Sequence, residues 1–186
     1  MVNLDKHFGR LGNRMFQLAF CYAYARDHNI DFYYQDPKWF EKYSNEIKQI
    51  FSEGIGHDGR VSIHVRRAGN PSNLEEPDYY NNPFYKTLGE DYYKKAMDLF
   101  PNRKFIVFSD DIEWCVNQEM FKNCDFSDRS EKEDFTLMAS CDGHIIANST
   151  FSWWAAYLGK GRVVAPKEWY ADGIERTICP KEWIKI

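Results

Sequence analysis

The spacing of apolar and polar positions predicts short strands and helices that follow one another along the chain. Residues 60–67 alternate strictly, with Val61, Ile63 and Val65 on one face, so this stretch is expected to be a strand. Other short apolar runs predict strands, and spacings of three and four predict helices. The further strands are expected at 30–34, 104–108, 145–147 and 162–165, and the helices at 13–26, 39–51, 91–100, 112–120, 131–140 and 151–158.

Strands and helices alternate after residue 60, which is typical of a parallel sheet with right-handed crossovers, so we expect an α/β fold. Residues 52–59 contain three glycines and are expected to form a hinge. The hinge predicts a short N-terminal lobe, 1–58, and a parallel-sheet C-terminal lobe, 59–186. Ligands are then expected in the crevice between the lobes, at the carboxyl ends of the strands.

Composition narrows the class of protein. A chain of 186 residues that is 44% hydrophobic can form a packed core, and its net charge of −4 argues against a broad nucleic-acid or acidic-membrane surface. No apolar run approaches the ~18 residues that a membrane span needs. Charged residues, from Asp5 to Arg14, stand where a signal peptide would be apolar. We therefore expect a cytoplasmic protein without an integral membrane segment.

The five cysteines are odd in number and lack CxxC spacing, so they are expected to be reduced thiols, in neither a disulfide framework nor a zinc site. Asn148-Ser149-Thr150 matches the N-glycosylation pattern. Because no secretion signal is recognised and the triplet adjoins a predicted buried strand, we interpret that match as accidental.

Residues 144–158 contain an apolar run, the polar triplet and then an aromatic helix. A strand, a polar turn and a helix are how an α/β sheet presents a helix N-terminus to an anion. Ser149 or Thr150 is expected to cap this helix, and their hydroxyls and nearby backbone N–H groups suit phosphate oxygens. Taken alone, the stretch favours an ordinary capped helix over an anion site, and the wider sequence shifts that balance.

Two arginines, Arg66 and Arg67, end the predicted strand at 60–67. In an extended strand they face opposite ways, so one can point into a cleft while the other pairs with the scaffold. Adjacent guanidinium groups suit a phosphate, and the alternative is two surface arginines. His64 lies on the same strand face as Arg66, where a packed histidine is at least as consistent as a ligand contact.

Two further stretches carry candidate chemistry. Gly9 and Gly12 permit a tight turn with close approach of a ligand, and Asn13 stands where the following helix would have its N-cap. Asp110 and Asp111 follow the strand at 104–108. Such carboxylates can bind sugar or base hydroxyls and N–H groups, or they can cap the next helix.

The motifs GRLGNRMFQ, HVRR, FIVFSDDIEWC, DFTLMASCDGHIIANSTFSWW and VVAPKEWY follow one another over nearly the whole chain. In this order they resemble the α-1,2-fucosyltransferase family, and the GRLGN turn and Ser-Thr-Phe are also similar to protein O-fucosyltransferases. The resemblance implies a GT-B-like fold of two Rossmann-like lobes. It implies inverting transfer of fucose from GDP-fucose to an oligosaccharide hydroxyl, with O2 of galactose as the expected position. No metal or other cofactor is implied, and an enzyme of this kind would work in the cytoplasm or at the periphery of a membrane where glycans are assembled.

The resemblance also implies roles for individual residues. Arg66 would contact the diphosphate and help the bond to fucose break, and Arg10 would close over the donor from the first lobe. The remaining donor-binding residues would be Asn13 from the first lobe, His64, Arg67 in support, Asp110 at the nucleoside, and Ser149, Thr150 and the N–H of Phe151 at the phosphates.

The sequence departs from the family in two places. Where the family continues its double arginine with an acidic triplet, this chain has Ala68-Gly69-Asn70, and Glu75, Glu76 or Asp78 would have to substitute for the missing carboxylate. The stretch between GRLGN and HVRR is also short. Two alternatives therefore stay open: a catalytically impaired nucleotide-sugar-binding protein derived from the family, and an α/β module whose motifs serve packing alone.

Overall fold

The computed structural model describes residues 11–28, 44–52, 54–67, 85–172 and 178–186. The chain forms two compact units, Met1–Gly54 and Ile55–Ile186. The predicted strand at 30–34 lies outside the described residues, as do Gly9, Arg10 and the loop that follows Arg67.

The first unit contains two described helices, α1 at Leu11–His28 and α2 at Ser44–Phe51. The prediction that Asn13 caps the first helix is wrong, because α1 begins at Leu11 and Asn13 lies within its first turn. Gly12 is also helical and buried, so the predicted turn does not reach it. The apolar face explains the earlier start, since Gly12 extends by one step the buried series that continues through Met15, Phe16 and Ala19.

The second unit is built on one parallel sheet with strand order β3-β2-β1-β4-β5-β6, so the predicted α/β class is confirmed. Its strands are β1 at Asp58–Val65, β2 at Phe105–Ser109, β3 at Asp125–Phe126, β4 at Cys141–Ile145, β5 at Arg162–Ala165 and β6 at Ile184–Lys185. Its helices are α3 at Glu90–Asp98, α4 at Ile112–Val116, the short 3-10 helix η4 at Glu119–Phe121, α5 at Glu131–Ser140 and α6 at Thr150–Leu158. The GT-B-like pairing of two lobes stays a prediction.

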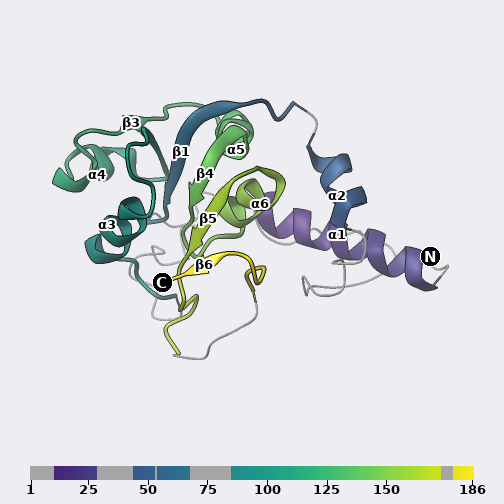
Figure 1. Ribbon diagram of the computed structural model, residues 1–186. Helices are drawn as coiled ribbons and strands as arrows, with labels where there is room; N and C mark the ends of the chain where they lie inside the picture. Colours follow the sequence, from purple (N-terminus) through teal and green to yellow (C-terminus); the bar gives the residue numbers. More distant parts are fainter. Residues whose placement is uncertain (1–10, 29–43, 53, 68–84, 173–177) are drawn as a thin grey trace. The chain divides into compact units, whose positions relative to one another are not determined.

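Alternation along β1 places its side chains in two different layers. Val61, Ile63 and Val65 belong to a buried cluster with residues of α3, α4 and η4. Ser62 and His64 point to the opposite face, which carries α5 and α6, as the ring contact of His64 with Phe151 of α6 shows. Figure 1 shows the same arrangement, with α3 and α4 on one face of the sheet and α5 and α6 on the other. The sheet is therefore wound in both directions and covered on both faces.

Several boundaries differ from those predicted. The strand expected at 145–147 is β4, which starts at Cys141 and ends at Ile145. Gly143 lies within this strand. A glycine suits the position because a Cβ there would lie 2.6 Å from the Phe100 ring, so the glycine serves packing and not a turn. The helix expected at 112–120 ends at Val116, and a 3-10 turn follows. The two-residue strands β3 and β6 were not predicted.

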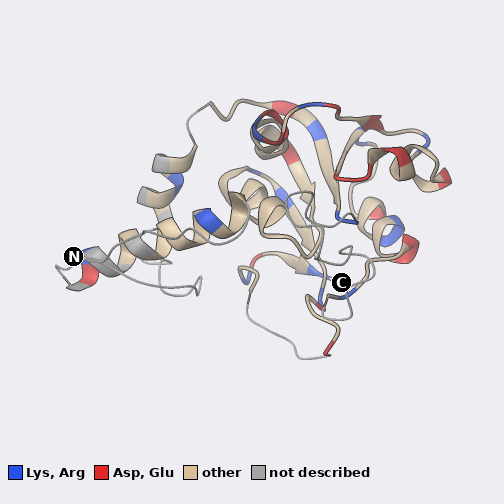
Figure 2. Cartoon of the chain, turned by 180° about the vertical axis from the view of Figure 1, so that it is seen from behind, with Lys and Arg blue, Asp and Glu red and all other residues tan. Residues whose placement is uncertain are grey.

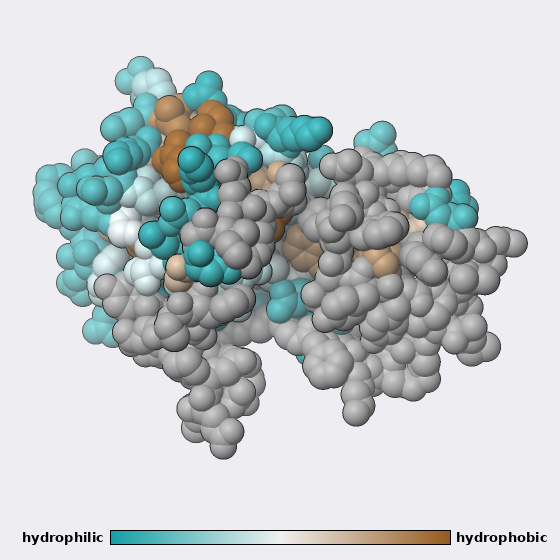
Figure 3. All heavy atoms as spheres, turned by 90° about the horizontal axis from the view of Figure 1, so that it is seen from below, coloured by the Kyte–Doolittle hydropathy of each residue, from teal (hydrophilic) through white to brown (hydrophobic). Residues whose placement is uncertain are grey.

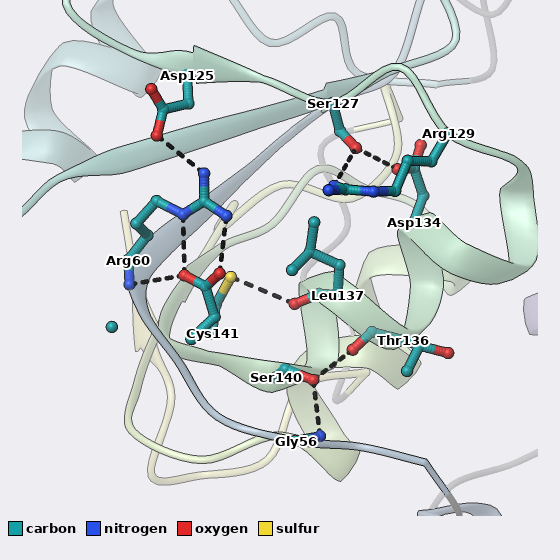
Figure 4. A network of polar contacts seen from close by, with 12 residues as sticks. Gly56, Arg60, Asp125, Ser127, Arg129, Asp134, Thr136, Leu137, Ser140 and Cys141 are labelled. Carbon is teal, nitrogen blue, oxygen red and sulfur yellow. Dashed lines mark hydrogen bonds and ion pairs between the residues drawn. The ribbon is translucent and has the colours of Figure 1, made fainter.

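Polar contacts join the amino ends of β1 and β3. Arg60 at the start of β1 donates to Asp58 Oδ2 at 2.7 Å and, across the intervening β2, to Asp125 Oδ2 of β3 at 2.8 Å. Figure 4 shows the reach of Arg60 to Asp125. The hydrogen bonds to Asp58 chiefly raise the pKa of Arg60, so this guanidinium is always charged.

The surface of the second unit carries both signs of charge, and Figure 2 shows basic and acidic residues interspersed over its helices and strands. In the view of Figure 3, hydrophilic residues surround a patch of apolar ones. Trp169 and Trp183, which lie in the segment after β5, are each 7% exposed, so this segment packs back on the second unit. None of the helices in the described ranges is long and apolar enough to cross a membrane.

Candidate functional site

The order of the strands locates a ligand crevice in this kind of sheet. Within the sheet, β1 is followed on one side by β2 and β3, and the chain then crosses back to form β4 on the other side of β1. Doubly wound sheets bind their ligands where the order reverses, outside the carboxyl ends of the strands. Here that point lies between the end of β1 at Val65 and the end of β4 at Ile145, which are neighbours because Ile63 pairs with Ile145.

Arg66 and Arg67 follow β1 directly, because this strand ends at Val65 and not at Arg67 as predicted. Arg66 forms an ion pair with Asp110, which follows the end of β2, and the Arg66 side chain is 13% exposed. The backbone N–H of Arg67 donates to the other Asp110 oxygen at 2.9 Å. Asp110, which the resemblance assigns to the nucleoside, is therefore already engaged by both arginines through its two carboxylate oxygens.

The start of α6 lies beside the same strand end. Ser149 occupies the N-cap position with an extended backbone, and Thr150 is the first helical residue. The Ser149 hydroxyl makes no capping hydrogen bond, so capping is by position and not by the side chain. The Phe151 ring lies 5.6 Å from the His64 ring, centroid to centroid, which places the first turn of α6 over the last residues of β1. Helix N–H groups in a first turn lack partners inside the helix and favour anions.

His64 is buried and electrically neutral. Burial, and to a smaller extent the positive charge of Arg66, lower its pKa to about 3. Its Nδ1 has no hydrogen-bond partner among the residues that the structure describes. The side chain packs against Phe151, as expected of a packed histidine, and at neutral pH it brings no positive charge to a phosphate. Its assignment to donor binding stays a prediction.

Asn148 is a structural residue that the sequence reasoning missed. Its buried side-chain amide donates to the backbone carbonyl of Lys86 at 2.7 Å and to that of Trp169 at 2.9 Å. Tyr92 of α3 adds a hydrogen bond from its hydroxyl to the Ile146 carbonyl at 2.6 Å. Through Asn148, the polar triplet thus links the segment before α3 and the segment after β5 to the end of β4. The position of Asn148 directly after a buried apolar run was the available signal.

A pocket of about 330 Å³ lies where these tied segments meet. It is lined by residues that precede and begin α3, by the segment after β5 and by the C-terminal residue: Lys86, Thr87, Leu88, Gly89, Tyr92, Lys95, Pro166, Lys167, Glu168 and Ile186. None of the predicted site residues lines it. Lys86 and Glu168 pair across it at 2.8 Å, which leaves the ammonium groups of Lys95 and Lys167 in excess.

Two of the predicted site residues come from the first lobe. Arg10 lies outside the described residues, and Asn13 belongs to the other compact unit. Their closure over a donor stays a prediction. Among the described side chains, no cluster of three histidines, cysteines or acidic residues could hold a metal ion.

Taken together, fold and charged edge define a doubly wound α/β protein with arginines and a helix N-terminus at its switch point. The model of glycosyl transferase family 11 matches residues 4–186, and the chain belongs to that family. The resemblance to α-1,2-fucosyltransferases is thereby confirmed.

Three relatives show the range of named activities. An alpha-1,2-colitosyltransferase of Escherichia coli is 30% identical over 181 residues, which cover 83% of this chain and 61% of that protein. The O-antigen biosynthesis glycosyltransferase WbnK of Escherichia coli is 36% identical over 142 residues, covering 68% and 44%. Galactoside alpha-(1,2)-fucosyltransferase 1 of Saimiri sciureus is 37% identical over 84 residues, covering 39% and 23%. The chain thus spans about half the length of the first two relatives.

Proposed function

We propose that this chain transfers fucose from GDP-fucose to a hydroxyl of a glycan acceptor, in an α-1,2 linkage, with inversion at the sugar and without a metal ion. Membership of glycosyl transferase family 11 and the names of the relatives support α-1,2 glycosyl transfer. The observation that carries the proposal is that Arg66 and the N-terminus of α6 both follow strand ends at the switch point of the sheet: Arg66 comes directly after β1, and Phe151 in the first turn of α6 contacts His64 of β1.

The chemistry explains why these groups belong together. As the acceptor oxygen bonds to the anomeric carbon of fucose, the bond from that carbon to the diphosphate oxygen breaks on the opposite face, which inverts the configuration. The acceptor hydroxyl gives up its proton to water or to the departing diphosphate. Negative charge then grows on the leaving diphosphate and must be neutralised in place. A guanidinium donates two hydrogen bonds to phosphate oxygens, and a helix N-terminus adds backbone N–H groups and the positive end of its dipole.

His64 does not act as a proton donor or acceptor in this proposal. Because burial holds its pKa near 3, it is neutral throughout the range in which a general base would titrate. Its role is to pack under Phe151 and support the first turn of α6. Rate acceleration comes instead from a good leaving group held in a fixed geometry.

The donor sugar deserves a direct comparison, since one relative is named for colitose and another for fucose. The chain, purified as it stands, is incubated with GDP-fucose or GDP-colitose and a panel of β-galactosides, with and without EDTA. Released GDP and the linkage of the product are measured. We expect GDP-fucose to give an α-1,2 product at the same rate in EDTA.

Each other outcome has a defined meaning. Activity that EDTA abolishes contradicts the metal-free mechanism, and preference for GDP-colitose contradicts the assigned donor. Binding of GDP without transfer or hydrolysis would favour the nucleotide-sugar-binding alternative that Ala68-Gly69-Asn70 left open. Absence of any GDP binding at millimolar concentration would contradict the proposal as a whole.

A further inference from the structure

Asp111 and Trp114 hold the Arg67 side chain in place, and we call these three residues the clamp. The ends of β1 and β2 lie side by side, because Val65 pairs with Ser109, and each strand continues into two charged residues. The Arg67 side chain is 18% exposed, and its Nε donates to Asp111 Oδ2 at 3.3 Å. The centre of the guanidinium stands 3.7 Å above the Trp114 ring, well inside the range of a cation–π contact.

The two residues that hold Arg67 also hold each other. The backbone N–H of Trp114 donates to Asp111 Oδ1 at 3.2 Å, so Asp111 caps α4 with one oxygen while the other accepts from Arg67. The N–H of Asp111 itself donates to the Ser109 hydroxyl at 3.0 Å. Asp111, Trp114 and Arg67 therefore form a closed triangle of contacts that is anchored to the end of β2.

This triangle controls the residue next to Arg67. Arg66 and Arg67 are joined by one planar peptide, so contacts that fix Arg67 also restrict the direction in which Arg66 leaves the chain. The Arg67 N–H bond to Asp110 secures the peptide between the two arginines, and Asp110 pairs with Arg66 from the same position. Both arginines are thus oriented by the pair of aspartates that ends β2.

We propose that Asp111 and Trp114 are positioning residues that act through Arg67 to orient Arg66, and that Arg67 serves this clamp instead of binding the diphosphate. The inference rests on the proposed function, because it assigns Arg66 to the leaving group. It changes the interpretation of the SDDIEWC motif: its second aspartate and its tryptophan, which follow the end of β2 by two and five residues, position the arginines without touching the donor.

The test compares two substitutions of the tryptophan. Trp114→Leu removes the aromatic face and is expected to lower kcat with GDP-fucose about tenfold, as loss of a partly desolvated cation–π contact would. Trp114→Phe keeps a ring and is expected to retain activity within about threefold of wild type. Val116→Ala, on the exposed face of the same helix, is the matched control and should not change kcat. Thermal midpoints identify any variant that is merely unstable.

A mutant cycle separates positioning from general packing. If Trp114 acts through Arg67, the double variant Arg67→Met with Trp114→Leu should be no less active than Arg67→Met alone. Losses that multiply in the double variant would overturn the inference, as would wild-type kcat in a folded Trp114→Leu protein. Where Trp114→Leu does not fold, Asp111→Asn replaces it in the same cycle.

The proposed function and the inference fail differently. If wild type transfers fucose and Arg66→Ala does not, yet the Trp114 and Asp111 variants match wild type, the clamp alone is disproved. If Arg66→Ala transfers at the wild-type rate, the assignment of Arg66 is wrong, and the clamp loses its target as well.

Discussion

Mild acid is expected to destabilise the second unit, because the native sheet buries two neutral histidines. His144 is 0% exposed, and its Nε2 lies 3.1 Å from the Lys160 carbonyl while its Nδ1 lies 2.9 Å from the Ser62 hydroxyl. A carbonyl only accepts, so the proton sits on Nε2, and Nδ1 accepts from Ser62. Protonation of His144 would reverse its hydrogen bond with Ser62, whose hydroxyl could then donate to the Gly143 carbonyl, but it would bury a positive charge.

The direction of the effect follows from the shifted pKa values. Burial lowers the pKa of His64 to about 3 and that of His144 to about 4, against an ordinary value of 6.5. As the pH falls below 6.5, both histidines become protonated in the unfolded chain but stay neutral in the native protein. The free energy of unfolding is therefore fully present above pH 6.5 and is lost as the pH falls toward 4.

The magnitude can be worked from these values. Each histidine contributes a slope of up to about 1.4 kcal/mol per pH unit. Between pH 7 and pH 5 each histidine costs roughly 2 kcal/mol, or roughly 4 kcal/mol for the pair, against a total stability of about 5–15 kcal/mol for a typical domain. Asp58, whose pKa is lowered by its hydrogen bonds to Arg60, responds only at lower pH and does not obscure this window.

Urea unfolding at pH 7, 6 and 5, followed by tryptophan fluorescence, measures the loss. His144→Gln cannot titrate, so its stability should depend on pH about half as steeply as that of wild type, whatever its stability at pH 7. His57→Gln is the control, because the His57 side chain is 79% exposed. Equal stability of wild type at pH 7 and pH 5, or an unchanged slope in His144→Gln, would refute the reasoning.

Two further predictions concern the amino ends of the strands. Gly161 has φ +88°, and a Cβ there would lie 1.9 Å from the Asp142 carbonyl oxygen, so Gly161→Ala should lower the thermal midpoint sharply. Gly59→Ala is the control, because a Cβ at Gly59 would meet nothing within 4 Å, and it should not lower the midpoint. Similar midpoints for the two variants would contradict this account of the turn before β5. Asp125→Asn should lower the free energy of unfolding by at most about 1 kcal/mol, because Asp125 is exposed and Asp58 still pairs with Arg60. Asp58→Asn should lower it more, as measured by urea unfolding. The reverse order would show that the link to β3 dominates.

Local pattern was sufficient where one face of an element decides its burial. The alternation of Val61, Ile63 and Val65 predicted β1, and the bounds predicted for α5, 131–140, are those observed. Local pattern failed where a distant partner decides. Gly143 resembles a turn residue until the Phe100 ring is known to fill the space of its side chain, and a two-residue strand such as β3 has too little sequence to be distinguished from a loop.

The candidate site divides in the same way. The arginines after β1 and the polar residues before α6 could be predicted, because the carboxyl ends of parallel strands share one edge. The partners of these residues could not. That Asp110 meets Arg66, that Trp114 lies under Arg67 and that Asn148 ties two loops are consequences of strand order and register, which no single stretch of sequence encodes.

The central claim is that Arg66 holds the diphosphate of the donor. Titration calorimetry with GDP, run beside the fucose transfer assay on wild type, Arg66→Ala and Arg103→Ala, tests it most directly. Arg103 is the matched control, because its guanidinium contacts Gly59 and Asp142 at the amino ends of β1 and β4. The account predicts that Arg66→Ala weakens GDP binding at least about tenfold and slows transfer by roughly a hundredfold or more, while Arg103→Ala matches wild type. An Arg66→Ala protein that binds GDP and transfers fucose as wild type does would contradict it.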